Sequence, residues 1–293
     1  MTEKTGEDRE KKRRAMISGF AAMAVSVAGF SCMGLALRGS RGVFGPSTAM
    51  LWRGLVGLAL VIPVALFTRT SLRGGNALWL WIRGLSGSVS LLLFFIAVSH
   101  LDLGTATALC YTYPVFASIF SAIHLRERVT FSGWIAIALS WIGIAVMVGY
   151  RPGTGRYELY GMFSGILAGV AIHSVRALRS QGETLAAILS SFFAISCLVA
   201  LPGAMMESPR LGLEWSMIPG LLSVGMLATV GQAGLTLAYR HLPTRLGSPL
   251  SLVVVPLSMI GAYFLFGEQP ASTAAVGSVL LFLSVAWLAH SQR

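Results

Sequence analysis

The sequence predicts an all-α integral membrane protein whose ten transmembrane helices form two inverted five-helix repeats. Composition points to a membrane, because 55% of the 293 residues are hydrophobic and only 11% are charged, whereas about 25% of a soluble domain is charged. Ten separate apolar segments are each close to the ~20 residues that cross about 30 Å of hydrocarbon. Two of these segments, one in each half of the chain, share a mid-span proline and a stripe of small polar residues.

The predicted spans follow a charged tail and are joined by connections too short to hold a soluble domain. Residues 1–16 form the tail, which ends in Lys11-Lys12-Arg13-Arg14 and leads into a full-length span. A cleaved signal peptide would have a shorter apolar stretch, so we interpret the tail as a cytoplasmic anchor. The spans are predicted at residues 17–37, 46–67, 77–98, 103–124, 132–150, 160–178, 185–206, 216–239, 244–266 and 271–290.

The two halves of the chain resemble each other at an offset of 141 residues. This offset places Glu127 on Glu268, although Pro114 and Pro256 miss it by one residue. Because each repeat has an odd number of spans, the second enters the membrane from the opposite side, as is usual in secondary transporters. The predicted organisation is a basic tail at 1–16, repeats at 17–150 and 160–290, an external connector at 151–159 and a C-terminus at 291–293.

Basic residues set the predicted orientation. With the N-terminus inside, 15 of the 22 Lys and Arg residues fall in inner segments and 5 in outer loops, which satisfies the positive-inside rule with both termini cytoplasmic. The net charge of +11 has the same origin, so we expect no nucleic-acid partner. Arg53 and Arg83 lie within spans, and we expect their side chains to reach toward a nearby span end.

The sequence predicts no catalytic residues, no metal site and no cofactor. The three cysteines lie in apolar runs without paired spacing, and the chain has no P-loop, HExxH or GxGxxG sequence. Gly84-Leu85-Ser86-Gly87 has the GxSG form of an intramembrane serine protease, with His173 as the base that such a serine needs. Short glycine-serine strings are common where membrane helices pack, so this alternative is remote.

One face of the fourth predicted span is polar, which a lipid-facing helix does not need and a helix lining a solute path does. Its members recur at steps of three and four residues, the spacing of one helical face. A matching stripe on the ninth span surrounds Pro256. The cavity candidates on these two spans are Thr107, Tyr111, Pro114, Ser118, Ser251 and Pro256.

Two other spans carry polar groups that are costly to bury in lipid. Thr229 and Gln232 share a face of the eighth span, and an amide there must face protein or water. His173 follows the glycines of two overlapping GxxxG spacings, which favour close helix packing. His173 is either a cavity residue or a hydrogen-bonded core histidine, and Tyr111 either a substrate contact or a residue satisfied by a neighbouring helix. We predict that Tyr111 and His173 face the cavity and that Tyr113 does not.

Several segments resemble the drug/metabolite transporter (DMT) superfamily in its branch with two EamA-type repeats. They are TYPVFASIFSAIHLRERVT from Thr112, VVPLSMIGAYFLFGEQP from Val254, and MLWRG at residues 50–54. The family usually has Leu-Gly-Glu where this chain has Leu125-Arg126-Glu127, a departure outside the membrane core. Within the branch, the chain is similar to the YddG-type exporters of aromatic and other neutral amino acids.

The resemblance implies a central cavity between the third, fourth, eighth and ninth spans, with the first and sixth beside them. It implies a non-enzymatic exporter of neutral amino acids, aromatic ones included, in a bacterial inner membrane. The expected partners are the amino-acid substrate and the lipid bilayer, and the expected working unit is a monomer. The alternative is an exporter of lipophilic drugs or quaternary cations.

Overall fold

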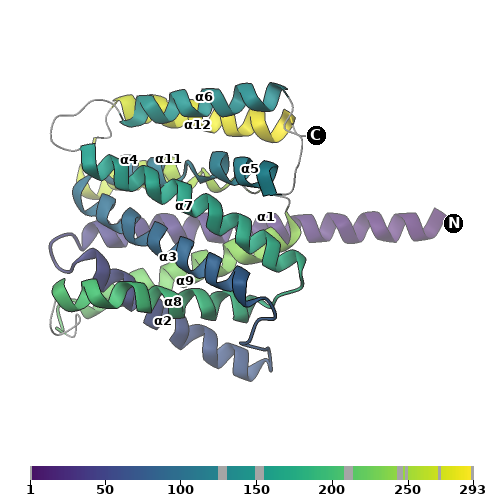
Figure 1. Cartoon of the computed structure of the whole chain (residues 1–293), viewed down its shortest axis with the longest axis horizontal. Coiled ribbons are helices and arrows are strands. Elements are labelled where there is room, and N and C mark those ends of the chain that lie inside the picture. The colour runs from purple at the N-terminus through teal and green to yellow at the C-terminus, as the bar shows by residue number, and fades with distance from the viewer. Residues whose placement is uncertain are drawn as a thin grey trace.

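The computed structural model describes residues 2–124, 131–148, 155–207, 214–242, 247, 250–269 and 272–291, and its secondary structure there is helical throughout. Figure 1 shows the helices lying side by side, with the N-terminal part of α1 projecting beyond the others. The helices are α1 (Thr2–Gly39), α2 (Pro46–Phe67), α3 (Ala77–His100), α4 (Leu103–Cys110), α5 (Tyr113–His124), α6 (Phe131–Val148), α7 (Gly155–Ser180), α8 (Leu185–Glu207), α9 (Ile218–His241), α11 (Val254–Phe266) and α12 (Ser272–Ser291).

Six of the described helices are long and apolar enough to cross a membrane. They are the Arg13–Gly39 part of α1 together with α2, α3, α7, α8 and α9. Each coincides with a predicted span to within a few residues. Shorter apolar helices, such as α11, account for further predicted spans. The fold is therefore that of a helical membrane protein, and the count of ten spans stays a prediction.

The helices pack in pairs that join the first half of the chain to the second. The most extensive pairings are α1 with α9, α3 with α7, α2 with α8 and α6 with α12. In addition, α4 packs on α11, α1 packs on α11, and α7 packs on both α4 and α5. Exchanging each span of one half for its counterpart in the other reproduces this set of pairings. Figure 1 shows α6 and α12 together at one side of the bundle.

The fourth and ninth predicted spans are both broken near the middle. In the fourth span the break lies just before the mid-span Pro114, at Tyr111 and Thr112, between α4 and α5. Pro114 is the second residue of α5, where its missing N–H costs no intrahelical bond. The Thr112 hydroxyl donates to the Leu109 carbonyl at 2.7 Å. Thus the proline begins a new helix rather than bending a continuous one.

The second break occupies the corresponding place. Turn residues Leu252 and Val253 precede α11, and Pro256 is the third residue of that helix. Val254, which starts α11, follows Tyr113, which starts α5, by 141 residues. The helix breaks therefore obey the repeat offset that the sequence predicted, whereas the prolines miss it by one residue.

Carboxylates from distant segments cap several helix N-termini. Glu207, at the end of α8, accepts from the N–H groups of Ser47 and Thr48 in the first turn of α2 at 2.9 and 2.8 Å. Glu268 accepts from Leu103 N–H at the start of α4 and also pairs with Arg38. First-turn N–H groups lack intrahelical partners, so these acids satisfy them and complement the helix dipole.

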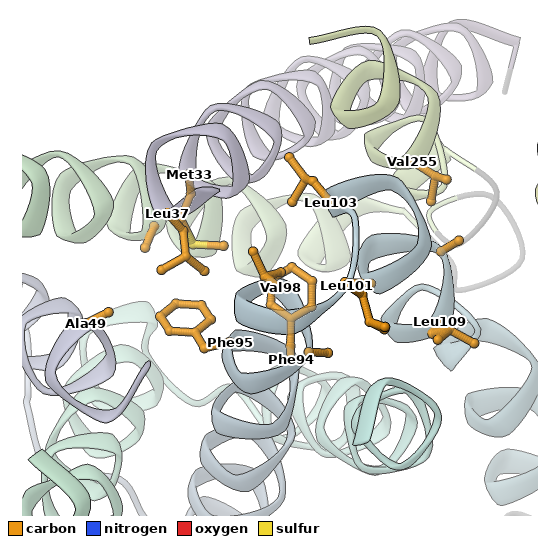
Figure 2. Close-up of a cluster of buried hydrophobic side chains, with 14 of the residues drawn as sticks. Met33, Leu37, Ala49, Phe94, Phe95, Val98, Leu101, Leu103, Leu109 and Val255 are labelled. Carbon is orange, nitrogen blue, oxygen red and sulfur yellow. The ribbon is translucent and has the colours of Figure 1, made fainter. Parts of the chain in front are cut away.

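A buried apolar cluster fills the bundle beside the junction of α3 and α4. Figure 2 shows Met33 and Leu37 of α1 facing Phe95 and Val98 of α3, with Leu103 of α4 next to them. Arg38 extends this junction through hydrogen bonds of 3.0 Å to two carbonyls of the α3 end, those of Val98 and Leu101. The cluster forms one boundary of the cavity described below, because Met33 also lines that cavity.

Candidate functional site

A cavity of about 110 Å³ lies between the two halves of the chain. Since a buried water needs roughly 10–15 Å³ by the same kind of measure, the space accommodates several water-sized groups. Its wall comes from α1, α2, α3, α4, α5, α7, α8, α9 and α11, while α6 and α12 pack on each other. This agrees with the cavity implied by the resemblance and adds α2 and α8. The polar wall residues are Arg53, Arg83, Ser90, Thr107, Cys110, Tyr111, Tyr113, Gln232 and Ser258.

The two helix breaks meet at this wall. Tyr111 lies in the first break and Tyr113 directly follows it, and the centroids of the two rings are 5.7 Å apart. The Tyr113 hydroxyl is 2.5 Å from that of Ser251, which precedes the second break. Val254, the first residue of α11, also lines the cavity. One hydrogen bond thus connects the broken span of one half to the broken span of the other.

Two arginines of the cavity wall are buried. The side chains of Arg53 on α2 and Arg83 on α3 are only 1% and 3% exposed. Their guanidinium carbons lie 5.0 and 3.9 Å from the ring centroid of Phe192 on α8, close enough for cation–π attraction. The Nε and Nη1 atoms of both arginines are buried without a hydrogen-bond partner among the described residues.

The expectation that Arg53 and Arg83 reach toward span ends was wrong. Both α2 and α3 pack against α8, and Phe192 and Phe193 of α8 hold the Arg53 guanidinium inside the protein. A position seven residues into a span is compatible with either direction along the helix. Only the neighbouring helix decides whether the side chain turns inward, so the sequence carried no decisive information on this point.

Three of the predicted site residues line the cavity. Thr107, Tyr111 and Gln232 come from α4, the first break and α9 respectively. The Thr107 hydroxyl donates to the carbonyl of Leu103 at 2.6 Å, which directs it along its own helix. Gln232 is 4% exposed and lies on a face of α9 that looks into the cavity. Their contact with a substrate stays a prediction.

The expectation that Tyr113 faces away from the cavity was wrong. A continuous helix would have placed Tyr111 and Tyr113 on different faces, because they are two residues apart. The break between them changes the chain direction, so both rings reach the same cavity. Ser90 of α3 and Ser258 of α11 also line it. Ser258 belongs to the polar stripe of the ninth predicted span, although it is not among the candidates named for that span.

The remaining predicted residues lie outside the wall of the described cavity. His173 is buried with its ring centroid 5.8 Å from that of Trp79, so it packs between α7 and α3. Thr229 donates to the Gly225 carbonyl in α9 at 2.8 Å, and the Ser251 hydroxyl contacts that of the wall residue Tyr113. Pro114 is buried where α5 begins, whereas Pro256 is exposed on α11. The Ser118 side chain lies outside the described residues.

The glycine stripe of α7 packs against the first helix break. A Cβ on Gly161 would come within 2.9 Å of Leu109, and one on Gly169 within 2.7 Å of Phe116. Between them, a Cβ on Gly165 would meet the Thr112 hydroxyl and would lie 2.7 Å from the Leu109 carbonyl oxygen. The stripe therefore allows α7 to touch the irregular backbone between α4 and α5, which is the packing interpretation of the GxxxG spacing.

The features considered for enzymatic chemistry have structural partners. Ser86 donates its hydroxyl to the carbonyl of Ile82 in its own helix at 2.6 Å. His173 contacts Trp79, as described above. Across the part of the chain that the structure describes, His, Cys, Asp and Glu side chains form no group of three that could hold a metal ion.

The first half of the chain matches the model of a known protein family. Residues 15–149 match the model of the EamA-like transporter family. The first half of the chain is therefore similar to EamA-like transporters. It covers the helices α1 to α6, including the first break and both cavity arginines.

Curated relatives extend the similarity over nearly the whole chain. The pseudopaline exporter CntI of Pseudomonas aeruginosa is 24% identical over 274 residues, covering 90% of this chain and 93% of that protein. The riboflavin transporter of Vibrio cholerae is 23% identical over 253 residues, covering 83% of each. A solved crystal structure has the same fold, with a TM-score of 0.68 at 20% identity over 94% of this chain and 97% of that one.

Proposed function

We propose that this EamA-like chain is a secondary transporter that carries a small organic solute by alternating access. The observation that carries the proposal is the cavity at the two helix breaks, walled by both halves of the chain. Discontinuous helices at the interface of two repeats are the usual site of substrate binding in such transporters. The matched repeat and the names of the relatives support the same assignment.

The proposed movement is a rocking of one repeat against the other, with repeats at 17–150 and 160–290. The pairing of helices between the halves supports this division, because exchanging the halves preserves it. Arg38, Glu268 and the start of α4 are tied together where α1 and α3 end. Opening there would require those contacts to separate. We propose that both termini lie on the cytoplasmic side of a bacterial inner membrane and that a monomer suffices.

Neutral amino acids, aromatic ones included, are the first substrate class to test, with export as the proposed direction. The wall combines hydroxyl, amide and aromatic groups with apolar residues such as Phe30 and Phe94, which suits a ring-bearing solute. A lipophilic or quaternary cation fits less well, because the two buried arginines of the cavity wall would repel its positive charge. Transport is proposed to be facilitated or weakly coupled. Cavity carboxylates are the usual proton carriers, and the described wall of this cavity contains no Asp or Glu.

Flux into proteoliposomes tests the proposal. Vesicles holding the purified protein and loaded with unlabelled phenylalanine should accumulate labelled phenylalanine by exchange, and vesicles without protein should not. Leucine should compete, and a pH gradient should change the rate less than twofold. If the protein exchanges a labelled quaternary cation and amino acids do not inhibit that exchange, cations and not amino acids are the substrate class. Absence of exchange for every solute class would contradict transport itself.

A further inference from the structure

Arg53 and Arg83 place two positive charges in the cavity wall, and a neutral amino acid has no net charge to balance them. Both side chains are almost fully buried, and both guanidinium groups lie over the ring of Phe192. Nε and Nη1 of each have no hydrogen-bond partner among the described residues. Two cations are therefore held away from water with these donors unused. Burying a charge in this state is costly unless a partner of opposite charge arrives.

Acids elsewhere in the described part of the chain have other partners. Glu268 is paired with Arg38, and Glu207 accepts from the first turn of α2. Glu183 accepts from the N–H groups before α3, and Asp102 caps α4. The wall residues themselves include two arginines and no carboxylate. Among the described residues no acid lines the cavity, so a solute that enters it is the candidate source of the charge that balances Arg53 and Arg83.

We propose that, among solutes that carry a ring, the cavity binds those of net negative charge more tightly than neutral amino acids, because their carboxylates pair with Arg53 and Arg83. Each guanidinium presents a planar fork of donors that matches a carboxylate, so two forks suit an organic dianion best. An aromatic or apolar part of the solute would lie against Phe94 and Tyr111. The carboxylate of a zwitterion can form one such pair, but its ammonium group is repelled by the two arginines of the wall. This inference rests on the proposed function, because it assumes that the solute occupies this cavity.

A series of ligands that share a phenyl ring and differ in charge tests the selectivity. Phenylsuccinate, 3-phenylpropionate, phenylalanine and phenethylamine carry charges of about −2, −1, 0 and +1 at neutral pH. A ligand that binds the folded state raises its thermal unfolding midpoint. The stabilisation of purified protein in detergent should decrease in the order given. Stabilisation greatest with phenylalanine or phenethylamine would overturn the inference, and equal stabilisation by inorganic phosphate would overturn the choice of a carboxylate.

Variants of the two arginines separate binding from folding. Arg53→Gln and Arg83→Gln should each raise the half-saturating concentration of phenylsuccinate by about thirtyfold or more, as expected on removing one partner of a buried charge pair. Arg73→Gln, an exposed arginine between α2 and α3, is the matched control and should change nothing. Without ligand, the Gln variants should be as stable as the natural protein or more so, because an unpaired buried charge is removed.

Lysine variants control for the possibility that the Gln variants lose affinity because they misfold. Arg53→Lys and Arg83→Lys keep the charge but lose the fork, so their affinity for phenylsuccinate should fall between those of the natural protein and the Gln variants. Unchanged affinity in both Gln variants would overturn the inference. Phenylalanine exchange without stabilisation by any anion would overturn it and leave the transport proposal intact. Anion binding that Arg53→Gln abolishes, with no exchange of any labelled solute, would instead overturn transport and leave the anion site.

Discussion

At the scale of single residues, the hydrogen bond between Tyr113 and Ser251 joins the two helix breaks. Tyr113 is 5% exposed and Ser251 is 3% exposed, with their oxygens 2.5 Å apart. A buried hydroxyl pair of this kind stabilises the arrangement mainly because either oxygen alone would lack a partner. If the halves rock against each other, this contact lies where their relative position is set.

Removing either hydroxyl should lower exchange, and removing both should add little. We expect Tyr113→Phe and Ser251→Ala each to reduce the exchange rate several-fold, with a coupling energy of about 0.5–3 kcal/mol in the double-mutant cycle. Exchange rates in proteoliposomes at equal protein content provide the measurement. Tyr263→Phe, at an exposed tyrosine of α11, is the control and should leave the rate unchanged. Strictly additive effects would show that the two hydroxyls do not act together.

At the scale of elements, α7 must approach the irregular backbone between α4 and α5. Gly165 makes this possible because a side chain there would meet Thr112 and the Leu109 carbonyl. The stripe is one of several close approaches, since a Cβ on Gly29 of α1 would lie 2.7 Å from the backbone nitrogen of Gly231 on α9. These approaches hold α1 to α9 and α7 to the first break.

Adding one methyl group at Gly165 should therefore destabilise the protein. Alanine normally stabilises a helix relative to glycine by about 0.5–1 kcal/mol, but overpacking at a close contact costs roughly 1–3 kcal/mol. We expect Gly165→Ala to lower the thermal unfolding midpoint in detergent. Gly155→Ala, at the start of the same helix with nothing within 4 Å of the added Cβ, should leave it unchanged or raise it. Equal midpoints for the two variants would argue against close packing of the stripe.

At the scale of the whole molecule, the order of helix pairings fits two exchanged halves. The pairs α1 with α9 and α3 with α7 are counterparts under that exchange, while α2 with α8 and α6 with α12 each map onto themselves. The breaks at the starts of α5 and α11 follow the same relation. An inverted orientation of the second half would place its breaks at the depth of the first, which is what a shared central site requires.

Cysteine labelling tests the proposed orientation. In a chain whose natural cysteines are replaced by serine or alanine, Arg41→Cys, in the turn between α1 and α2, should react with an impermeant thiol reagent on intact cells. Arg73→Cys, between α2 and α3, should react only after lysis. Thr154→Cys in the connector, which lies outside the described residues, should react from outside. The opposite pattern at the first two sites would reverse the proposed topology.

The sequence by itself determined the membrane class, the positions of the long helices, the repeat offset and three cavity residues, Thr107, Tyr111 and Gln232. These follow from hydropathy, segment length and helical spacing, which are properties of short stretches of chain. The 141-residue offset between the repeats is likewise visible in the sequence. Corresponding positions in the two repeats have similar structural environments and therefore keep similar residues.

Only the tertiary structure decided which way the buried polar side chains turn. Arg53 and Arg83 face the cavity because α8 packs against both of their helices. Tyr113 joins Tyr111 because the chain breaks between them, and His173 turns to Trp79 of α3. In a membrane protein both the lipid-facing and the packed faces of a helix are apolar, so helical periodicity does not distinguish them. The rotation of each helix about its axis is fixed only by the contacts it makes with its neighbours.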